Sequence, residues 1–188
     1  MRNGEIGKAY GTLIPESKFI LATHRKETPM SEIRRKAIAG LKVGDSFTIK
    51  RTFTEEDMIA FAGITRDYNP VHFDHRFAAV KNFNSRICHG LLVAGMLTEV
   101  GGQIGWLASV MNFRFKKPVY FGDTIFCKLT LTDIDDRNRA RALAEYKNED
   151  GVLVLEAELE GIVPEEPEQE VLAAMVREGD PTNLVNDD

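Results

Sequence analysis

The fold of this chain depends on the stretch Cys88-His89-Gly90-Leu91-Leu92-Val93-Ala94-Gly95-Met96-Leu97, in which apolar side chains occupy all sides of a helix. A helix that is apolar all round is buried in a protein core or in a membrane. The stretch is far shorter than the ~20 residues that a membrane-spanning helix needs. It therefore predicts a buried central helix, which the rest of the domain must cover.

Downstream of this helix the hydrophobic pattern changes to a period of two, which is typical of strands. Four segments show it, at residues 111–115, 124–131, 140–146 and 152–161. Between them lie stretches with turn chemistry, at residues 117–123, 133–138 and 148–151. Four consecutive strands joined in this way predict an antiparallel meander.

Upstream of the central helix, alternation over residues 46–53 predicts a further strand. Thr54 offers a helix cap before an acidic first turn, so a helix should follow and run to about Gly63. A loop is expected over residues 67–74 around Asn69-Pro70, with Asp74 capping a short helix over 75–82. These elements predict an α+β domain whose antiparallel sheet wraps around a central helix. The sheet has an open edge, and pairing with a second copy commonly protects such an edge, so we expect a homodimer or a higher homo-oligomer.

The two ends of the chain carry opposite charge. Residues 1–41 sum to +4 and include a short amphipathic helix over 31–39, which should lean on the domain by Ile33, Ala37 and Ile38. Residues 164–188 sum to −7 and predict a loose or weakly helical acidic tail. We therefore expect a basic N-terminal extension at 1–41, a folded domain at 42–163 and an acidic tail at 164–188.

Composition excludes several classes of protein. The 188 residues are 43% apolar and 28% charged, which is the balance of an ordinary globular protein. A pI near 5.5 argues against nucleic-acid binding, and no membrane span is predicted. With two cysteines and no secretory signal pattern at the N-terminus, we expect reduced thiols and a cytoplasmic location.

Two polar sites could carry chemistry. Asp67 and His72 lie five residues apart across a proline-containing turn, where a carboxylate and an imidazole can share the activation of one water. Alternatively, Asp67 only caps a turn and His72 is a half-buried histidine. His89-Gly90 opens the central helix, where free N–H groups favour an oxyanion, although Gly90 could instead serve tight packing with His89 as a cap or supporting residue.

Two rival chemistries find little support in the residues. His72, Asp74 and His75 could be assembled into a metal ligand set, but their spacing matches no known zinc or iron motif, so no metal is predicted. Cys88 neighbours His89, yet adjacent residues on a helix point apart. We therefore assign Cys88 to the core rather than to nucleophilic catalysis.

The motif residues resemble those of a known family. Asp67-Tyr68-Asn69-Pro70-Val71-His72-Phe73-Asp74, then His89-Gly90, then Pro118-Val119-Tyr120-Phe121-Gly122-Asp123 together resemble the MaoC-like, R-specific enoyl-CoA hydratases of the hot-dog fold. The resemblance covers roughly residues 42–163, the block in which the strands and the central helix fall.

This resemblance implies a catalytic pair and a substrate. Asp67 and His72 would hold the water that adds across a trans-2-enoyl thioester, or leaves an R-3-hydroxyacyl thioester, and the Gly90 N–H would bind the enolate oxygen. Asn69 would shape the site. The substrate would be an acyl-CoA or acyl-carrier-protein thioester, without a cofactor. Basic residues should meet the phosphates of CoA, and Arg86, Lys116 and Lys117 flank the motif segments.

Two other functions remain open for the same fold. One is a non-catalytic module that binds acyl thioesters, and the other is a hot-dog thioesterase that hydrolyses the thioester and releases a free thiol. Retention of both Asp67 and His72 favours the hydratase.

Overall fold

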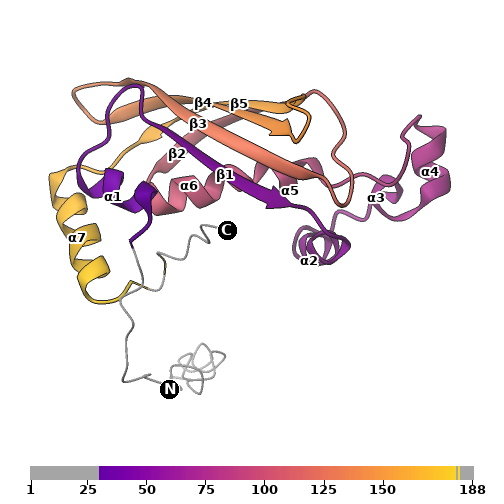
Figure 1. The fold of residues 1–188 in the computed structure, drawn as a ribbon, viewed down its shortest axis with the longest axis horizontal. Coiled ribbons are helices and arrows are strands. Elements are labelled where there is room, and N and C mark those ends of the chain that lie inside the picture. The colour runs from indigo at the N-terminus through magenta and orange to yellow at the C-terminus, as the bar shows by residue number, and fades with distance from the viewer. Residues whose placement is uncertain (1–29, 181, 183–188) are drawn as a thin grey trace, which may run out of the picture.

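The structure is a computed structural model that describes residues 30–180 and 182. Five strands form one antiparallel sheet, and the helices α5 (Gly90–Ala94) and α6 (Met96–Ile104) lie along one face of it (Figure 1). The strands are β1 (Ser46–Thr52), β2 (Leu107–Phe115), β3 (Thr124–Ile134), β4 (Arg139–Asn148) and β5 (Leu153–Ile162). This confirms the predicted sheet around a central helix.

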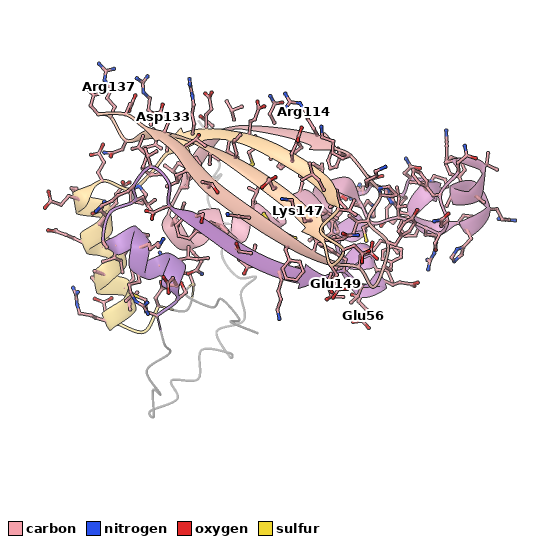
Figure 2. All side chains as sticks on the ribbon, turned by 45° about the horizontal axis from the view of Figure 1, so that its top comes forward. Glu56, Arg114, Asp133, Arg137, Lys147 and Glu149 are labelled. Carbon is pink, nitrogen blue, oxygen red and sulfur yellow. The ribbon has the colours of Figure 1, made fainter. Side chains whose placement is uncertain are left out.

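The two faces of the sheet differ in polarity. Along β4, Ala140, Ala142, Ala144 and Tyr146 are buried, and the residues between them are exposed or partly exposed. The outer face carries charged side chains such as Arg114 and Lys147 (Figure 2). Tyr146 reaches inward, and its hydroxyl donates to the carbonyl of Ala94 at 2.8 Å, which joins the sheet to the end of α5.

The predicted meander of four strands is wrong in one position. The strand order is β1-β3-β4-β5-β2, so β3, β4 and β5 follow one another as hairpins, whereas β2 pairs with β5 at the far edge. The segment from Lys116 to Asp123 is too long for a tight hairpin. It connects the edge strand β2 to β3, which lies next to the opposite edge strand, β1. On its way, Tyr120 forms an isolated bridge with Ile87, just before the central helix.

The central helix also differs from the prediction. It begins at Gly90, and α5 and α6 follow each other across Gly95, whose backbone stays right-handed helical. It is not buried on every side, since Leu91 is 61% exposed while Val93, Ala94, Met96 and Leu97 are buried.

Three helices lie at one end of α5 (Figure 1). The helix α2 (Glu55–Thr65) has the predicted Thr54 cap, and α4 (His75–Val80) has the predicted Asp74 cap. The predicted loop between them contains a single helical turn, α3 (Pro70–Phe73), which Asn69 caps and Pro70 starts. Proline suits the first position of a helix, where no N–H is needed.

The opposite end holds the helices from outside the motif block. The predicted short N-terminal helix is α1 (Glu32–Ile38), with Ile33 and Ala37 in the main hydrophobic core. The acidic tail, expected to be loose or weakly helical, contains a regular helix, α7 (Glu166–Arg177), which packs against α1. Residues 1–29 of the predicted basic extension lie outside the described residues. The division at residues 41 and 163 stays a prediction.

Candidate active site

The turn before the central helix is held by the segment that joins β2 to β3. Cys88 donates its backbone N–H to the carbonyl of Val119 at 2.8 Å, beside the bridge between Ile87 and Tyr120. Residues 87–90 are therefore fixed to the segment that joins β2 to β3. This anchoring sets the position of the first turn of α5.

Asp67 lies on a short loop that the end of α2 creates. Arg66 ends α2 in the left-handed conformation, with φ of 59°, and so turns the chain out of the helix. The Asp67 carboxylate accepts the backbone N–H of Asn69 at 3.2 Å, and its side chain is half exposed. One carboxylate oxygen is tied to the loop in this way, and Oδ2 faces two histidines.

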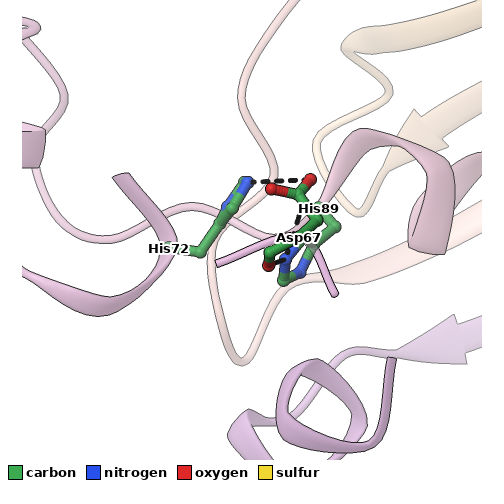
Figure 3. Close-up of side chains that lie close together, drawn as sticks. All are labelled: Asp67, His72 and His89. Atoms are coloured by element: carbon green, nitrogen blue, oxygen red, sulfur yellow. Dashed lines mark hydrogen bonds and ion pairs between the residues drawn. The ribbon is translucent and has the colours of Figure 1, made fainter. Parts of the chain in front are cut away.

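His72 lies on α3 and is buried. Its Nδ1 lies 2.8 Å from the carbonyl oxygen of Ile87. A carbonyl only accepts, so Nδ1 donates and the lone pair of neutral His72 is on Nε2, a tautomer assigned from the hydrogen bond. This Nε2 lies 4.0 Å from Oδ2 of Asp67 (Figure 3).

The pKa of His72 is lowered from its ordinary value. Burial is the largest cause, because it disfavours the charged imidazolium, and His89 lowers the pKa further. The hydrogen bond to Ile87 and the charge of Asp67 act in the opposite direction. The balance favours a neutral His72 whose Nε2 can accept a proton.

His89 joins this pair, although the sequence pattern indicated only a capping or supporting role for it. It is 1% exposed, its ring stacks on His72 with centroids 3.8 Å apart, and its Nε2 lies 2.9 Å from the backbone carbonyl oxygen of Asp67. Its Nε2 is also 4.0 Å from Oδ2 of Asp67 (Figure 3). The one sequence signal for His89 was its place next to Gly90.

A cavity of about 310 Å³ opens beside these residues. Its lining is mainly apolar and comes from the 83–93 segment, the end of β2 with the segment after it, and the start of β5; His72 and Gly90 are part of the lining. Gly90 begins α5, so its N–H has no acceptor within the helix. A histidine lone pair and a backbone donor thus border one mainly apolar space.

The donor set does not suit a resident metal. Asp67, His72 and His89 are the described residues whose ligand atoms come within 4.8 Å of one another; the set sketched from the sequence with Asp74 and His75 is not formed. The Nε2 of His89 is engaged as a donor to the Asp67 carbonyl, so its lone pair does not face the group. Only the Asp67 carboxylate and Nε2 of His72 are then free to coordinate.

The predicted substrate-binding residues have different surroundings. Asn69 accepts the N–H of Val71 through its side chain and so caps α3 beneath His72. Arg86 forms an ion pair with Glu55 and lies over the ring of Phe121, with its side chain 16% exposed. Lys116 and Lys117 both line the cavity, and Lys116 pairs with Glu156 at 2.7 Å.

Cys88 is a core residue, as predicted. It is 4% exposed, and burial raises the pKa of its thiol to about 12, with the charges of Asp123 and Asp57 adding to the effect. A thiol with such a pKa is not a thiolate near neutral pH. Cys88 therefore does not act as a nucleophile.

Comparison with known proteins bears on this geometry. The pattern of the family described as MaoC like domain matches residues 41–152. The chain is 34% identical over 151 residues to 3-hydroxybutyryl-CoA dehydratase of Methylorubrum extorquens, covering 77% of this chain and 94% of the relative. It is 31% identical to the (R)-specific enoyl-CoA hydratase of Rhodospirillum rubrum, over 66% of this chain and 89% of that one.

A solved structure is similar as well. The unliganded R-hydratase of Pseudomonas aeruginosa superposes with a TM-score of 0.63 at 31% identity, and the match covers 69% of this chain and 86% of that one. The sheet and its central helix are those of the hot-dog fold. In the part of the chain that the structure describes, every helix is too short or too polar to cross a bilayer.

Proposed function

The chain belongs to the MaoC-like dehydratase family, and from that premise we propose that Asp67, His72 and the Gly90 N–H carry out its chemistry. The protein is an R-specific enoyl-CoA hydratase/dehydratase, which adds water reversibly to a trans-2-enoyl thioester. One observation carries the assignment of the site. It is the pair of proton acceptors, Oδ2 of Asp67 and Nε2 of His72, that face each other 4.0 Å apart, with His72 in the lining of the cavity.

This spacing suits one water molecule. A water about 2.8 Å from each atom can donate one proton to Asp67 and the other to His72. As the water oxygen bonds to the β-carbon of the enoyl group, one member of the pair takes a proton. A proton then passes from the pair to the α-carbon, and both groups return to their starting state. The net reaction adds one water across the double bond.

Gly90 supplies the other half of the chemistry. Attack at the β-carbon moves negative charge to the thioester oxygen, so a donor aimed there stabilises the transition state more than the ground state. The free N–H at the start of α5 is such a donor, and no side chain at position 90 stands in the way. An acyl chain fits the mainly apolar cavity.

The substrate is an acyl thioester of CoA or of an acyl carrier protein. Both present a phosphopantetheine arm, and CoA adds further phosphates. Lys117 is the best placed of the predicted basic residues, because it lines the cavity whereas Lys116 is paired with Glu156. Contact of Arg86 with a phosphate would require its pair with Glu55 to open. Asn69 acts by shaping α3.

The protein acts as a homodimer in this proposal. The edge strand β2 exposes apolar side chains, with Leu107 69%, Val110 45% and Met111 43% accessible. Exposed apolar edges promote pairing with another chain. Sedimentation of the purified protein at micromolar concentration should give twice the chain mass, and a monomer would contradict the proposal.

A reducing compartment is part of the same proposal. Cys88 and Cys127 are both buried and unpaired. Free buried thiols are typical of proteins kept under reducing conditions. This supports the cytoplasmic location, and fractionation of the source cells would test it.

The proposed activity is tested with crotonyl-CoA. Hydration removes the conjugated double bond, so the ultraviolet absorbance of the enoyl thioester should fall while no free thiol appears. Release of thiol at the same rate would identify a thioesterase, and binding without any turnover would identify a non-catalytic module. The product should be the R-3-hydroxy thioester, which a chiral separation of the released acid would confirm.

A further inference from the structure

His89 contacts both groups of the proposed catalytic pair. Its Nε2 bonds the main chain of Asp67, and its ring covers one face of the His72 ring (Figure 3). The residue is 1% exposed, whereas the carboxylate of Asp67 is half exposed. His89 is the least exposed of the three residues, and unlike His72 it is not part of the cavity lining.

The hydrogen bond to Asp67 fixes the tautomer of His89. A backbone carbonyl can only accept, so Nε2 carries the proton in this 2.9 Å contact. The other ring nitrogen, Nδ1, is buried without a hydrogen-bond partner among the described residues. A buried polar atom without a partner costs stability and calls for a physical reason. In His89, Nδ1 has no partner because the ring is oriented so that Nε2 donates to the backbone carbonyl of Asp67.

The contact between His89 and His72 holds the plane of the His72 ring. The two imidazoles are 3.8 Å apart at an angle of 28°, while Nδ1 of His72 is tied to Ile87. Against rotation of the His72 ring about its Cβ–Cγ bond, the contact with Ile87 supplies a single hydrogen bond. The flat face of His89 stops this motion and keeps Nε2 of His72 directed at Asp67.

The backbone of His89 connects the pair to the start of α5. Its carbonyl accepts the N–H groups of Leu92 and Val93, so it is the cap of the helix that Gly90 begins. Cys88, on its other side, is tied to Val119. One residue thus joins the Asp67 loop, the His72 ring and the Gly90 N–H to a fixed part of the domain.

We propose that His89 is a positioning residue for hydration, which sets the spacing of Asp67 and His72 from the Gly90 N–H. It does so with its Nε2–H on the Asp67 carbonyl and its ring face on His72. It exchanges no proton with the substrate. The inference rests on the proposed function of the site.

The competing explanation is that His89 only fills space. Its ring also contacts Phe61 and Phe73, with centroids 5.2 and 6.3 Å away. A space-filling residue would tolerate any side chain of similar volume, and its loss would lower stability and activity together. A positioning residue instead requires a donor at one particular point.

Three variants separate these explanations. In His89→Gln the amide nitrogen takes the place of Nε2 and can still donate to Asp67. In His89→Asn the amide nitrogen takes the place of Nδ1 and falls short. In His89→Phe the ring stays and the donor is lost. The Gln and Asn variants form a matched pair, because they carry the same amide group and differ only in side-chain length.

We expect His89→Gln to keep kcat within about tenfold of the parent. His89→Asn and His89→Phe should lose about 100-fold in kcat, the cost of displacing reacting groups by about 1 Å, with little change in KM. Equal losses in the Gln and Asn variants, full activity in the Phe variant, or losses that follow the melting temperature would overturn the proposal. If the Asn variant does not fold, the Gln and Phe variants give the same contrast.

A measurement without substrate separates this inference from the proposed function. Long-range ¹H–¹⁵N spectra of histidine-labelled protein report which ring nitrogen carries a proton. They should show His89 protonated on Nε2 and His72 on Nδ1, and His89→Gln should preserve the His72 signal. A proton on Nδ1 of His89 would refute the inference even in an active enzyme. Failure of hydration with these signals present would refute the proposed function instead.

Discussion

At the scale of single residues, the protonation state of His72 decides whether the pair can accept a proton from water. The neutral form exposes a lone pair on Nε2, and the imidazolium does not. The pKa of His72 is lowered chiefly by burial, so the neutral form persists to a lower pH than for a free histidine, whose pKa is about 6.5. Protonation of His72 as the pH falls removes the acceptor and stops hydration.

We therefore predict an acid limb of kcat/KM with its midpoint below about 6.5. The profile is measured with crotonyl-CoA in buffers of constant ionic strength, and NMR titration of His72 in the free protein should give the same midpoint. A midpoint at or above 6.5 in both measurements would show that the pKa of His72 is not lowered, and different midpoints in the two would show that another group limits activity.

The second prediction at this scale concerns Lys117. Replacing it with Ala should raise KM for the CoA ester by about two- to fivefold at low salt, the usual strength of an exposed ion pair, and leave kcat unchanged. Lys116→Ala should have less effect because Lys116 is paired with Glu156. The effect should shrink as salt screens the contact.

Two controls keep this prediction specific. Lys147→Ala removes a cation from the outer face of the sheet and should leave KM unchanged (Figure 2). A crotonyl thioester of N-acetylcysteamine lacks the phosphates, so Lys117→Ala should not alter its KM. Equal effects on both thioesters would place the phosphates elsewhere.

At the scale of elements, the first turn of α5 lies against Phe115 of β2, and a side chain at position 90 would collide with that ring. A Cβ added there would lie 2.7 Å from a ring atom of Phe115, at the end of β2. Such a contact is too close, so the Phe115 ring must move, and it can because it is 54% exposed. Both residues line the cavity.

We predict that Gly90→Ala lowers kcat/KM by about 100-fold with little loss of thermal stability, because it displaces the thioester oxygen from the N–H. The loss should be smaller in a Phe115→Ala background, where the added methyl group has room. The double-mutant cycle measures this coupling. Additive losses, or a fall in melting temperature in proportion to activity, would reduce Gly90 to a packing residue.

The elements also show how far the sequence could predict the fold. Alternation identified all five strands, and the Thr54 and Asp74 caps placed two helices. Alternation does not say which strand is a neighbour, so the pairing of β2 with β5 was missed. Glu and Pro in the tail favoured a loose or weakly helical segment, whereas α7 is a regular helix and its Leu172 packs on the core.

The candidate site was predictable to a similar degree. Asp67, His72 and Gly90 stand in motifs that can be recognised in the chain. The role of His89 depends on a contact with Asp67 across 22 residues and on a ring stacked over His72. No local pattern encodes such contacts, because they depend on how α3 and α5 come together.

At the scale of the whole molecule, a buried polar cluster ties the two ends of the described chain together. Arg34 of α1 is 2% exposed and lies 3.3 Å from a carboxylate oxygen of Asp180, which follows α7. Arg34 also donates to the hydroxyl of Thr182, whose carbonyl accepts from Gln103 of α6. The cluster lies at the end of the molecule away from α2 and α3 (Figure 1).

Removing one partner of a buried ion pair leaves the other charge buried and unpaired, which lowers stability by about 3–5 kcal/mol. We therefore predict that Arg34→Met lowers the free energy of unfolding by about that amount in urea titrations. Adding Asp180→Leu should recover part of the loss, and kcat of the folded protein should not change. Deletion of residues 164–188 should lower the free energy of unfolding in the same way, because it leaves Arg34 buried without its partner Asp180. Parent-like stability in Arg34→Met would show that the pair is unimportant.

The most direct test of the account asks whether Asp67 and His72 perform hydration. Asp67→Asn and His72→Gln each remove proton handling with little change in shape, and should lower kcat on crotonyl-CoA by about 10²–10⁴-fold without lowering the melting temperature. The matched controls Asp133→Asn and His75→Gln change exposed residues of the same types and should keep parent activity. Folded Asp67→Asn and His72→Gln variants with near-parental kcat would contradict the account.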